Sequence, residues 1–492
     1  MRRFRSRLLA IGAAAAVTML VVAAGHAAIP VPAVTGPITS GGGAFVTPLS
    51  AIDLGAAGYV EEEFFVAGTA SAHSPAGAFT ADGKWSAVRG ETAPYVTRLL
   101  VRRPTSARKF NGTVVVEWLN VSGGVDAAPD FTFAHTLLLR EGFAWVGVSA
   151  QYVGVEGGAS PLGLDLSLKK INPGRYGALS HPGDSFSYDM FSQAAAAIRT
   201  PGGIPPLGPL KAKRILGIGE SQSAFRLVTY VNAVHPLARV YDGFLVHSRG
   251  GGAAALAQSP QPSAPVPTPA FIRDDLSEPV LIFETETDLI SLAYFPARQD
   301  DSHNVQLWEV AGTAHDDAYG LSAGPADAGP AALDTTYLPP VTSIFGVLTC
   351  AAPINAGPQH YVYAAALSRL NRWVKSHRVR RRPMPRLQVD AGPPAALVLD
   401  ARGNVLGGIR TPQMDVPVAV QSGLGQPPGG FCGLFGTSAP FDAPTLAQLY
   451  PSHARYVSAV VKAARKAVRA QVLLRADLPA IKAAAVASAI GN

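Results

Sequence analysis

The sequence is poor in cysteine and in charge. Only 2 of its 492 residues are cysteines, and charged residues make up 15% of the chain. Two cysteines exclude a disulfide-dense scaffold, and no CxxC or HExxH pair offers zinc spacing, so we expect neither a metal nor another cofactor. With 48% hydrophobic residues, the chain has ample apolar surface to bury, which excludes a disordered charged tail. The absence of an internal repeat argues against a solenoid or propeller.

The first 27 residues have the composition of an export signal. Several arginines precede an uncharged apolar stretch at residues 8–25, and Gly25 and Ala27 occupy the small-residue positions of a cleavage site. This pattern predicts a signal peptide over residues 1–27 and a secreted or extracytoplasmic protein of the cell envelope or periplasm. An uncleaved membrane anchor is the alternative, because about 18 apolar residues just span a bilayer. No later stretch is comparable, so we expect no integral membrane span after cleavage.

The charge that remains without the leader is small. The whole chain holds 41 Lys and Arg against 34 Asp and Glu, and loss of the leader reduces its net charge of +7 to +3. A basic run at residues 375–386 lacks the aromatic interleaving or the helical basic face typical of nucleic-acid contacts. We therefore expect no nucleic-acid partner.

The two cysteines, Cys350 and Cys432, form a candidate pair. In an oxidising compartment two lone cysteines are often bridged, and this bridge would tie a late loop to the C-terminal region. Two free, buried thiols are the alternative, because sequence spacing fixes no geometry.

Strand-like and helix-like segments alternate along the chain after a Pro-, Gly- and Ser-rich stretch. Strands are expected at residues 59–66, 95–101, 113–119, 143–149, 214–218, 242–247, 279–284 and 305–310. Helices are expected at residues 130–141, 187–198, 359–375 and 456–474, and from the turn after residue 218 through 231. Such βα repeats predict an α/β fold, with a doubly wound, mostly parallel sheet covered by helices on both faces.

This pattern places almost the whole chain in one domain. We interpret residues 28–45 as a flexible linker and residues 46–492 as the domain, with a C-terminal extension from about residue 387. A Pro- and Ala-rich insert at about residues 250–278 separates two core strands, where it would form either a lid or a passive loop. Ligands of such sheets bind at the carboxyl ends of strands, so the residues that follow strands are candidates for chemistry.

The candidate nucleophile is Ser221, within Gly219-Glu220-Ser221-Gln222-Ser223. This segment directly follows an apolar strand and directly precedes a helix, the context of a nucleophile elbow. The turn is sharp and needs small neighbours, although Ser223 stands where the usual motif has glycine. The alternative is an ordinary serine that caps a helix.

A serine nucleophile needs a base and an orienting acid, in the chain order Ser, acid, His. His315 follows the strand at 305–310 and is the candidate base. The run from Glu284 to Asp288 follows the strand at 279–284 and holds three carboxylates. We favour Asp288 as the acid because it lies at the tip of the loop, with Glu286 as the alternative.

The oxyanion hole needs two N–H donors. The backbone of Gln222, which follows the candidate nucleophile, is the first expected donor. The second should come from the loop after the strand at 113–119, where Gly123 and Gly124 permit close approach of the backbone. Val121 is the favoured residue there, followed by Ser122.

Together these segments resemble the α/β-hydrolase superfamily, and more narrowly a bacterial family described only as alpha/beta hydrolase domain proteins. The segments that carry the resemblance are 114–124, 186–194, 217–227, 284–288, 312–315, 407–417 and 449–456. The resemblance covers about residues 45–485. It implies an eight-stranded type of sheet, a Ser–acid–His triad and ester hydrolysis.

The favoured function is therefore an exported serine hydrolase that cleaves a small-molecule or lipid-like carboxylic ester, through an acyl-enzyme on Ser221. An acyltransferase or amidase would use the same side chains. A non-catalytic exported binding protein of the same fold is the alternative from another class. The presence of all three candidate catalytic residues, Ser221, Asp288 and His315, argues against it.

Overall fold

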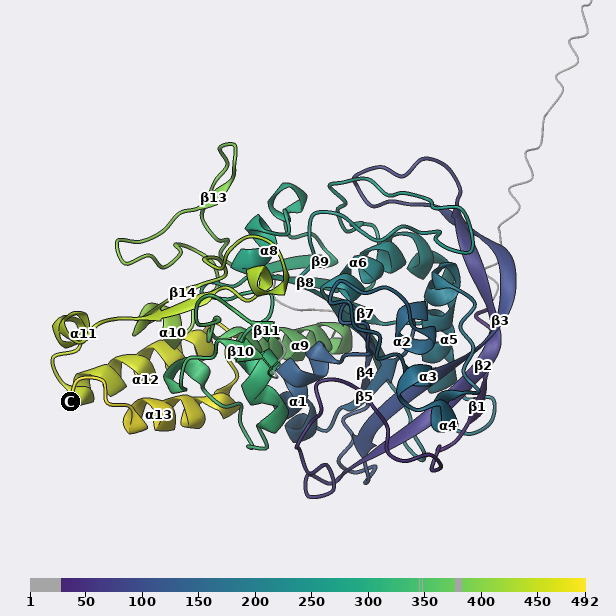
Figure 1. Cartoon of the computed structure of the whole chain (residues 1–492), viewed down its shortest axis with the longest axis horizontal. Coiled ribbons are helices and arrows are strands. Elements are labelled where there is room, and N and C mark those ends of the chain that lie inside the picture. Colours follow the sequence, from purple (N-terminus) through teal and green to yellow (C-terminus); the bar gives the residue numbers. More distant parts are fainter. Residues whose placement is uncertain (1–27, 345, 347, 377–382) are drawn as a thin grey trace, which may run out of the picture.

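The computed structural model describes residues 28–344, 346, 348–376 and 383–492, and its centre is a nine-stranded sheet (Figure 1). The strand order is β1-β2-β3-β5-β4-β6-β7-β8-β9. Strands β4 to β9 pair with one another in parallel, and β1, β2 and β3 form an antiparallel edge that pairs with β5. This confirms the predicted mostly parallel sheet. The nine strands are β1 (Ala33–Thr35), β2 (Tyr59–Pro75), β3 (Ala87–Pro104), β4 (Thr113–Trp118), β5 (Ala144–Val148), β6 (Arg214–Glu220), β7 (Gly243–His247), β8 (Val280–Glu284) and β9 (Val305–Glu309).

The helices lie between and after the strands. They are α1 (Pro129–Glu141), α2 (Tyr152–Glu156), α3 (Leu168–Ile171), α4 (Pro173–Tyr176), α5 (Ser187–Arg199), α6 (Gln222–Thr229), α7 (His235–Ala238), α8 (Glu286–Ile290), α9 (Gln359–Ser376), α10 (Pro412–Asp415), α11 (Ala443–Leu449), α12 (His453–Arg469) and α13 (Leu478–Ala487). A π-helical turn, Tyr230–Val234, continues α6. Three two-stranded ribbons complete the fold: β10 (Ser343–Ile344) with β11 (Leu348–Thr349), β12 (Val389–Asp390) with β13 (Ala396–Leu397), and β14 (Ala419–Ser422) with β15 (Thr437–Pro440).

Helices cover both faces of the sheet because the side chains of a strand alternate between them. On β4, Val114 and Val116 pack into one core with residues of α5 and α6. Val115, between them, packs into a second core with residues of α1 and α9. All three valines are fully buried, which explains why the strand is apolar at consecutive positions rather than at every second one.

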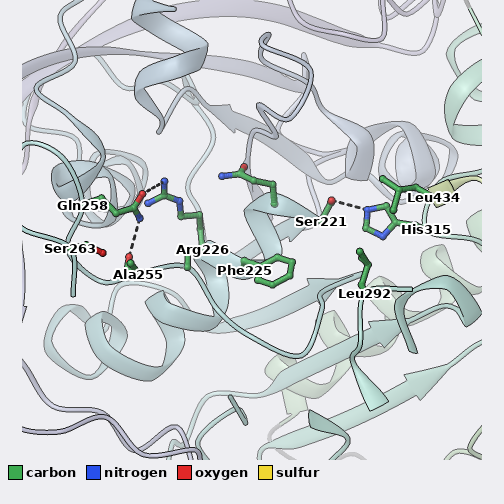
Figure 2. Close-up of a pocket in the computed structure, with 11 residues that line it drawn as sticks. Ser221, Phe225, Arg226, Ala255, Gln258, Ser263, Leu292, His315 and Leu434 are labelled. Atoms are coloured by element: carbon green, nitrogen blue, oxygen red, sulfur yellow. Dashed lines mark hydrogen bonds between the residues drawn. The ribbon is translucent and has the colours of Figure 1, made fainter. Parts of the chain in front are cut away.

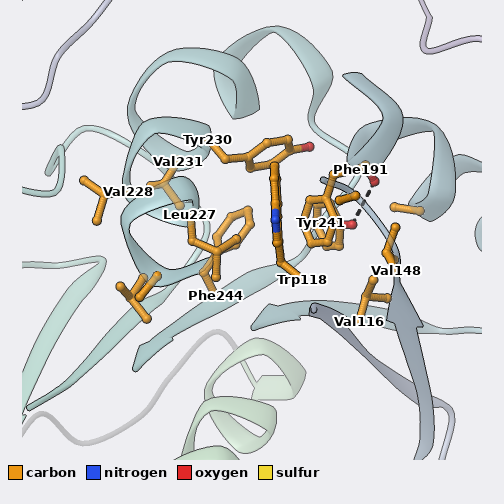
Figure 3. Close-up of a cluster of buried hydrophobic side chains, with 14 of the residues drawn as sticks. Val116, Trp118, Val148, Phe191, Leu227, Val228, Tyr230, Val231, Tyr241 and Phe244 are labelled. Atoms are coloured by element: carbon orange, nitrogen blue, oxygen red, sulfur yellow. Dashed lines mark hydrogen bonds between the residues drawn. The ribbon is translucent and has the colours of Figure 1, made fainter. Parts of the chain in front are cut away.

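Aromatic side chains fill the core under α5 and α6 (Figure 3). The rings of Trp118 and Phe191 lie 4.8 Å apart between centroids, and Phe191 stacks on Tyr241 at the same spacing. The Tyr241 hydroxyl donates a 2.9 Å hydrogen bond to the Phe191 backbone oxygen, so its polar atom is satisfied within the core. Burial of these rings fixes the two helices on the sheet.

The first two long strands extend beyond the expected segments. β2 and β3 pair from Tyr59 with Pro104 to Pro75 with Ala87, whereas the sequence pattern predicts strands only at residues 59–66 and 95–101. The added parts are rich in Ala, Gly, Ser and Thr, which carry little hydrophobic alternation. Pairing with the partner strand determines the structure there.

Residues 28–45 do not form the expected flexible linker. Ala33–Thr35 is strand β1, which pairs with β2 and adds the ninth strand to the eight that the resemblance implies. The buried Arg175 guanidinium donates hydrogen bonds to three backbone oxygens between residues 38 and 42. Because these oxygens exchange water for a charged donor, the segment is fixed along the domain.

The C-terminal extension packs against the last strand of the sheet. Ile409 exchanges backbone hydrogen bonds with Glu309 and Ala311 beside β9, and α12 packs on α13 and α10 beyond it (Figure 1). The predicted helix at 456–474 corresponds to α12. Within the described residues, no helix is both long and apolar enough to cross a bilayer. The predicted signal peptide, 1–27, and residues 377–382, half of the basic run at 375–386, lie outside the described residues.

A buried histidine on α9 makes the fold sensitive to acid. His360 is 1% exposed and stacks on Tyr319 with 3.8 Å between ring centroids. Burial lowers the pKa of His360 from 6.5 to about 3. Below pH 6.5 His360 therefore binds a proton in the unfolded chain but stays neutral in the native state. The free energy of unfolding falls as the pH is lowered, until the native pKa of His360 is reached.

We predict that His360→Phe removes this dependence. Between pH 6 and pH 4, the free energy of unfolding of the unmodified protein should fall, relative to the variant, by about 1.4 kcal/mol per pH unit. Urea denaturation at several pH values measures the difference, and His453→Phe at a less buried histidine is the matched control. Parallel pH dependences for His360→Phe and the unmodified protein would contradict the prediction.

Candidate active site

Ser221 occupies a sharp turn between β6 and α6. Its backbone angles are φ 57° and ψ −121°, a region that residues other than glycine rarely adopt. The Ser221 N–H donates a 2.9 Å hydrogen bond to the His247 oxygen at the end of β7, which holds the strained turn in place. The sequence predicts this strand–turn–helix context, and the turn projects the hydroxyl away from the sheet.

His315 brings together the serine and an acid. Its Nε2 lies 2.7 Å from Ser221 Oγ (Figure 2), and its Nδ1 lies 2.7 Å from Asp288 Oδ1. All three residues follow strands of the parallel part of the sheet, β6, β8 and β9. Residues that are 67 and 27 positions apart in the chain thus form one hydrogen-bonded series.

Asp288 is completely buried but well supplied with donors. Its Oδ2 accepts hydrogen bonds from the Thr285 backbone N–H and hydroxyl, both at 2.7 Å, in a capping box at the start of α8. Burial alone would raise the pKa of Asp288, but His315 and the bonds from Thr285 outweigh it and hold the pKa below its usual value. The carboxylate therefore stays ionised beside the imidazole.

Glu286, the alternative acid, does not contact the His315 ring. Its carboxylate accepts hydrogen bonds from the Gly312 N–H at 2.6 Å and the Gly423 N–H at 2.9 Å. Burial raises the pKa of Glu286 to about 7. The side chain thus joins the loop before His315 to the C-terminal extension, and its contacts are those of a brace.

The three expected oxyanion donors differ in availability. The Ser122 N–H already donates to Asn120 Oδ1 at 2.8 Å, so it is engaged elsewhere. Among the described residues, the N–H groups of Val121 and Gln222 donate no hydrogen bond. Gln222 is the first residue of α6 and lines the cavity beside Ser221, whereas Val121 is buried and lies outside that lining.

Sequence reasoning missed Glu220, the residue just before the serine. Its Oε1 lies 3.3 Å from His315 Nε2, and its side chain is nearly buried. Burial, followed by the neighbouring charge of Asp316, raises the pKa of Glu220 well above its ordinary value. An acid adjacent to the candidate nucleophile was the available signal, but the direction of its side chain could not be derived from the strand pattern.

Ser221 and His315 open onto a cavity of about 540 Å³ (Figure 2). Its lining combines apolar side chains with a few polar ones: Ser221, Gln222, Phe225, Arg226, Ala254, Ala255, Gln258, Ser263, Leu292, His315 and Leu434. At the polar end, Arg226 Nη2 donates to Asp184 Oδ2 at 2.7 Å and to Gln258 Oε1 at 3.0 Å. The reacting end and the charged end thus lie at opposite sides of Phe225 in Figure 2.

The insert at about 250–278 forms one wall of the cavity, through residues 254–263. Its backbone is held by neighbours: the Tyr188 hydroxyl donates to the Ala255 oxygen at 2.9 Å, and the Gln258 N–H donates to Ser185 Oγ at 2.7 Å. The insert, for which a lid and a passive loop were the two alternatives, thus lies beside the cavity that Ser221 and His315 line.

The C-terminal extension supplies another part of the wall. Leu434 lines the cavity, and its oxygen accepts a 3.4 Å hydrogen bond from the Asp316 N–H, next to His315. Two residues before Leu434, Cys432 forms a disulfide with Cys350. The pair expected to be bridged thus anchors the loop that carries Leu434.

A doubly wound sheet with a serine on a strained turn, and with a histidine and an acid after later strands, defines the α/β-hydrolase class. A family model described as alpha/beta hydrolase domain matches residues 34–483, and the chain belongs to that family. Membership of this family supports the interpretation of the protein as a hydrolase. No curated protein matches the chain.

Solved structures include similar chains of low sequence identity. A serine hydrolase without a lid from Xanthomonas campestris is 14% identical, with 50% of this chain and 86% of that chain covered and a TM-score of 0.28. An esterase from Rhizomucor miehei is 13% identical, with 63% of this chain and 86% of that chain covered and a TM-score of 0.30.

We predict that replacing both cysteines, Cys350→Ser with Cys432→Ser, lowers the free energy of unfolding by about 2–4 kcal/mol. The bridge closes a separation of 82 residues, so its loss frees the unfolded chain more than the native one. Urea denaturation without reductant measures the effect, and the unmodified protein in reductant should approach the variant. Equal stability of the two proteins without reductant would refute the prediction.

Proposed function

We propose that the protein is an exported serine hydrolase that cleaves carboxylic esters through an acyl-enzyme on Ser221. The observation that carries this proposal is the unbroken series from Ser221 Oγ through His315 to Asp288, with 2.7 Å at each hydrogen bond and a cavity at its serine end. A serine becomes a useful nucleophile when a base and an orienting acid are arranged in this way.

In the proposed first step, Ser221 Oγ attacks the ester carbonyl carbon while its proton moves to His315 Nε2. Asp288 accepts the hydrogen bond from Nδ1–H, which fixes the ring tautomer and stabilises the imidazolium that forms. Nε2–H then passes its proton to the leaving alcohol oxygen, and the C–O bond of the ester breaks. The acyl group remains on Ser221.

The negative charge on the carbonyl oxygen needs donors during attack. The Gln222 N–H, at the beginning of α6, is the best placed because the helix N-terminus also favours negative charge. The Val121 N–H is the proposed second donor, since Ser122 is engaged by Asn120. Water, activated by His315, then releases the acid and restores the serine.

The cavity suits a small or lipid-like ester rather than a polymer chain wrapped over a flat surface. Phe225, Leu292 and Leu434 offer apolar contacts near the serine, and Arg226 and Gln258 offer polar contacts farther away. A mainly apolar cavity with few polar groups is typical of a site for a small organic molecule.

Export is proposed from the leader pattern of residues 1–27. The disulfide between Cys350 and Cys432 supports the same compartment, because such bonds persist mainly outside the reducing cytosol.

We predict that Ser221→Ala abolishes hydrolysis of short p-nitrophenyl esters, with a fall in kcat of about 10³-fold or more. A fluorophosphonate probe should label the unmodified protein at Ser221 and leave the variant unlabelled, as mass spectrometry of peptides would show. Hydrolysis by the folded variant would remove the assigned nucleophile, and transfer to added alcohols or amines would identify an acyltransferase. A folded protein that neither labels nor hydrolyses would be a binding protein.

The two neighbouring acids provide a second, internally matched test. Asp288→Asn should lower kcat by about 10³- to 10⁴-fold, because an amide cannot hold the imidazole in the same way. Glu286→Gln should affect kcat much less, since the Glu286 carboxylate accepts hydrogen bonds from the Gly312 and Gly423 N–H groups, whereas Asp288 is bonded to the His315 ring. Steady-state kinetics on one ester compares them; the reverse order of effects would assign the acid role to Glu286.

A further inference from the structure

Glu220 is a buried carboxyl group that the proposed mechanism does not use, although it lies against the same ring nitrogen as the serine. Glu220 Oε1 is 3.3 Å from His315 Nε2, which is also 2.7 Å from Ser221 Oγ. Two oxygen atoms thus lie within 3.3 Å of Nε2. Only one of them, Ser221 Oγ, becomes bonded to the acyl group.

The position of the Glu220 carboxyl group is set by Asn120, two residues after β4. Asn120 Nδ2 donates to Glu220 Oε2 and to the Glu220 backbone oxygen, both at 3.1 Å. Asn120 Oδ1 accepts from the Ser122 N–H at 2.8 Å, which fixes which end of the amide faces Glu220. One carboxyl oxygen is thus occupied by Asn120, and the other is left beside His315.

We propose that Glu220 is a positioning residue that keeps His315 Nε2–H available for the leaving group; this rests on the proposed function. When Ser221 Oγ bonds to the acyl carbon, its proton moves to Nε2, and Oγ becomes a poor acceptor. Glu220 Oε1 then accepts from Nε2–H and holds the ring until the proton passes to the leaving oxygen. The protonation state of Glu220 does not change in these steps.

This role has a consequence that depends on the leaving group. An alkyl alcohol is weakly acidic and needs the proton from Nε2 in order to depart, whereas p-nitrophenolate departs without it. Loss of the Glu220 contact should therefore slow acylation by alkyl esters more than acylation by nitrophenyl esters. A loss of packing alone would slow both to a similar degree.

The test compares kcat/KM for ethyl butyrate and p-nitrophenyl butyrate, because kcat/KM reports the steps through acylation. In Glu220→Leu, the ratio of the ethyl to the nitrophenyl value should fall by about 10-fold or more, the scale of one hydrogen bond to a charged group. Glu220→Gln keeps one carbonyl oxygen, which Asn120 and His315 must share. Its ratio of the ethyl to the nitrophenyl kcat/KM should therefore lie between the ratios of Glu220→Leu and the unmodified protein.

Ser223→Ala is the matched control, since Ser223 Oγ donates to the Glu220 backbone oxygen at 2.8 Å within the same turn. Its ratio should stay within about twofold of the unmodified value, given that a single neutral hydrogen bond is lost. An unchanged ratio in folded Glu220→Leu would overturn the proposed role, whereas failure of the unmodified protein to hydrolyse either ester would overturn the proposed function instead.

A readout without turnover separates these outcomes further. Nitrogen NMR of the histidine rings at one fixed pH reports the surroundings of His315 Nε2, with the signal assigned by its loss in His315→Gln. The signal should shift in Glu220→Leu and stay in place in Ser223→Ala. An unshifted signal in Glu220→Leu would show that the carboxyl group does not hold this ring.

Discussion

An ionised carboxylate without access to water is the constraint on which the site depends. Asp288 is fully buried, and burial of an isolated charge would cost several kcal/mol. Three donors, from the His315 ring and from Thr285, offset that cost and lower the pKa of the carboxyl group. Because each donor occupies a defined position, the carboxylate that they stabilise also has one orientation, and so does the imidazole bonded to it.

The sheet sets the distances that this arrangement must cover. β6 and β9 are separated by β7 and β8, so at about 4.8 Å per strand the serine and histidine loops start about 14 Å apart. The loop after β9 must therefore reach across two strands. Several contacts brace it: Glu286 accepts from Gly312, Thr287 Oγ1 accepts from the His315 N–H at 3.2 Å, and Gln359 Nε2 donates to the His315 oxygen at 3.3 Å.

Much of this could be predicted because it follows from local pattern. Continuous apolar strands followed by polar residues place Ser221, Asp288 and His315 at one edge of a parallel sheet. The parts that escaped prediction depend on contacts between distant segments. β1 has three residues, too few to show a periodicity, and pairing with β2 is what makes it a strand.

The direction in which a side chain points is the second feature that could not be predicted from the sequence. Glu220 and Glu286 look alike in sequence, as acids near strand ends, yet one faces the His315 ring and the other faces two backbone N–H groups. Leu434 reaches the cavity from more than 100 residues after His315, because the C-terminal extension packs against the loop that carries His315. Neither fact is encoded in the spacing of a motif.

Apart from Ser221 and His315, the cavity wall comes from four places outside the strands: the first turns of α6, residues 254–263, the loop around Leu434, and Leu292 after α8. The residues of the hydrogen-bonded series and the residues that shape the cavity therefore belong largely to different segments of the chain. Residues 254–263 and the loop around Leu434 can differ between relatives and so change the shape of the cavity. The residues of the hydrogen-bonded series, Ser221, His315 and Asp288, need not change with them. In the enzyme that we propose, the residues that react and the residues that shape the cavity thus belong to separate parts of the chain.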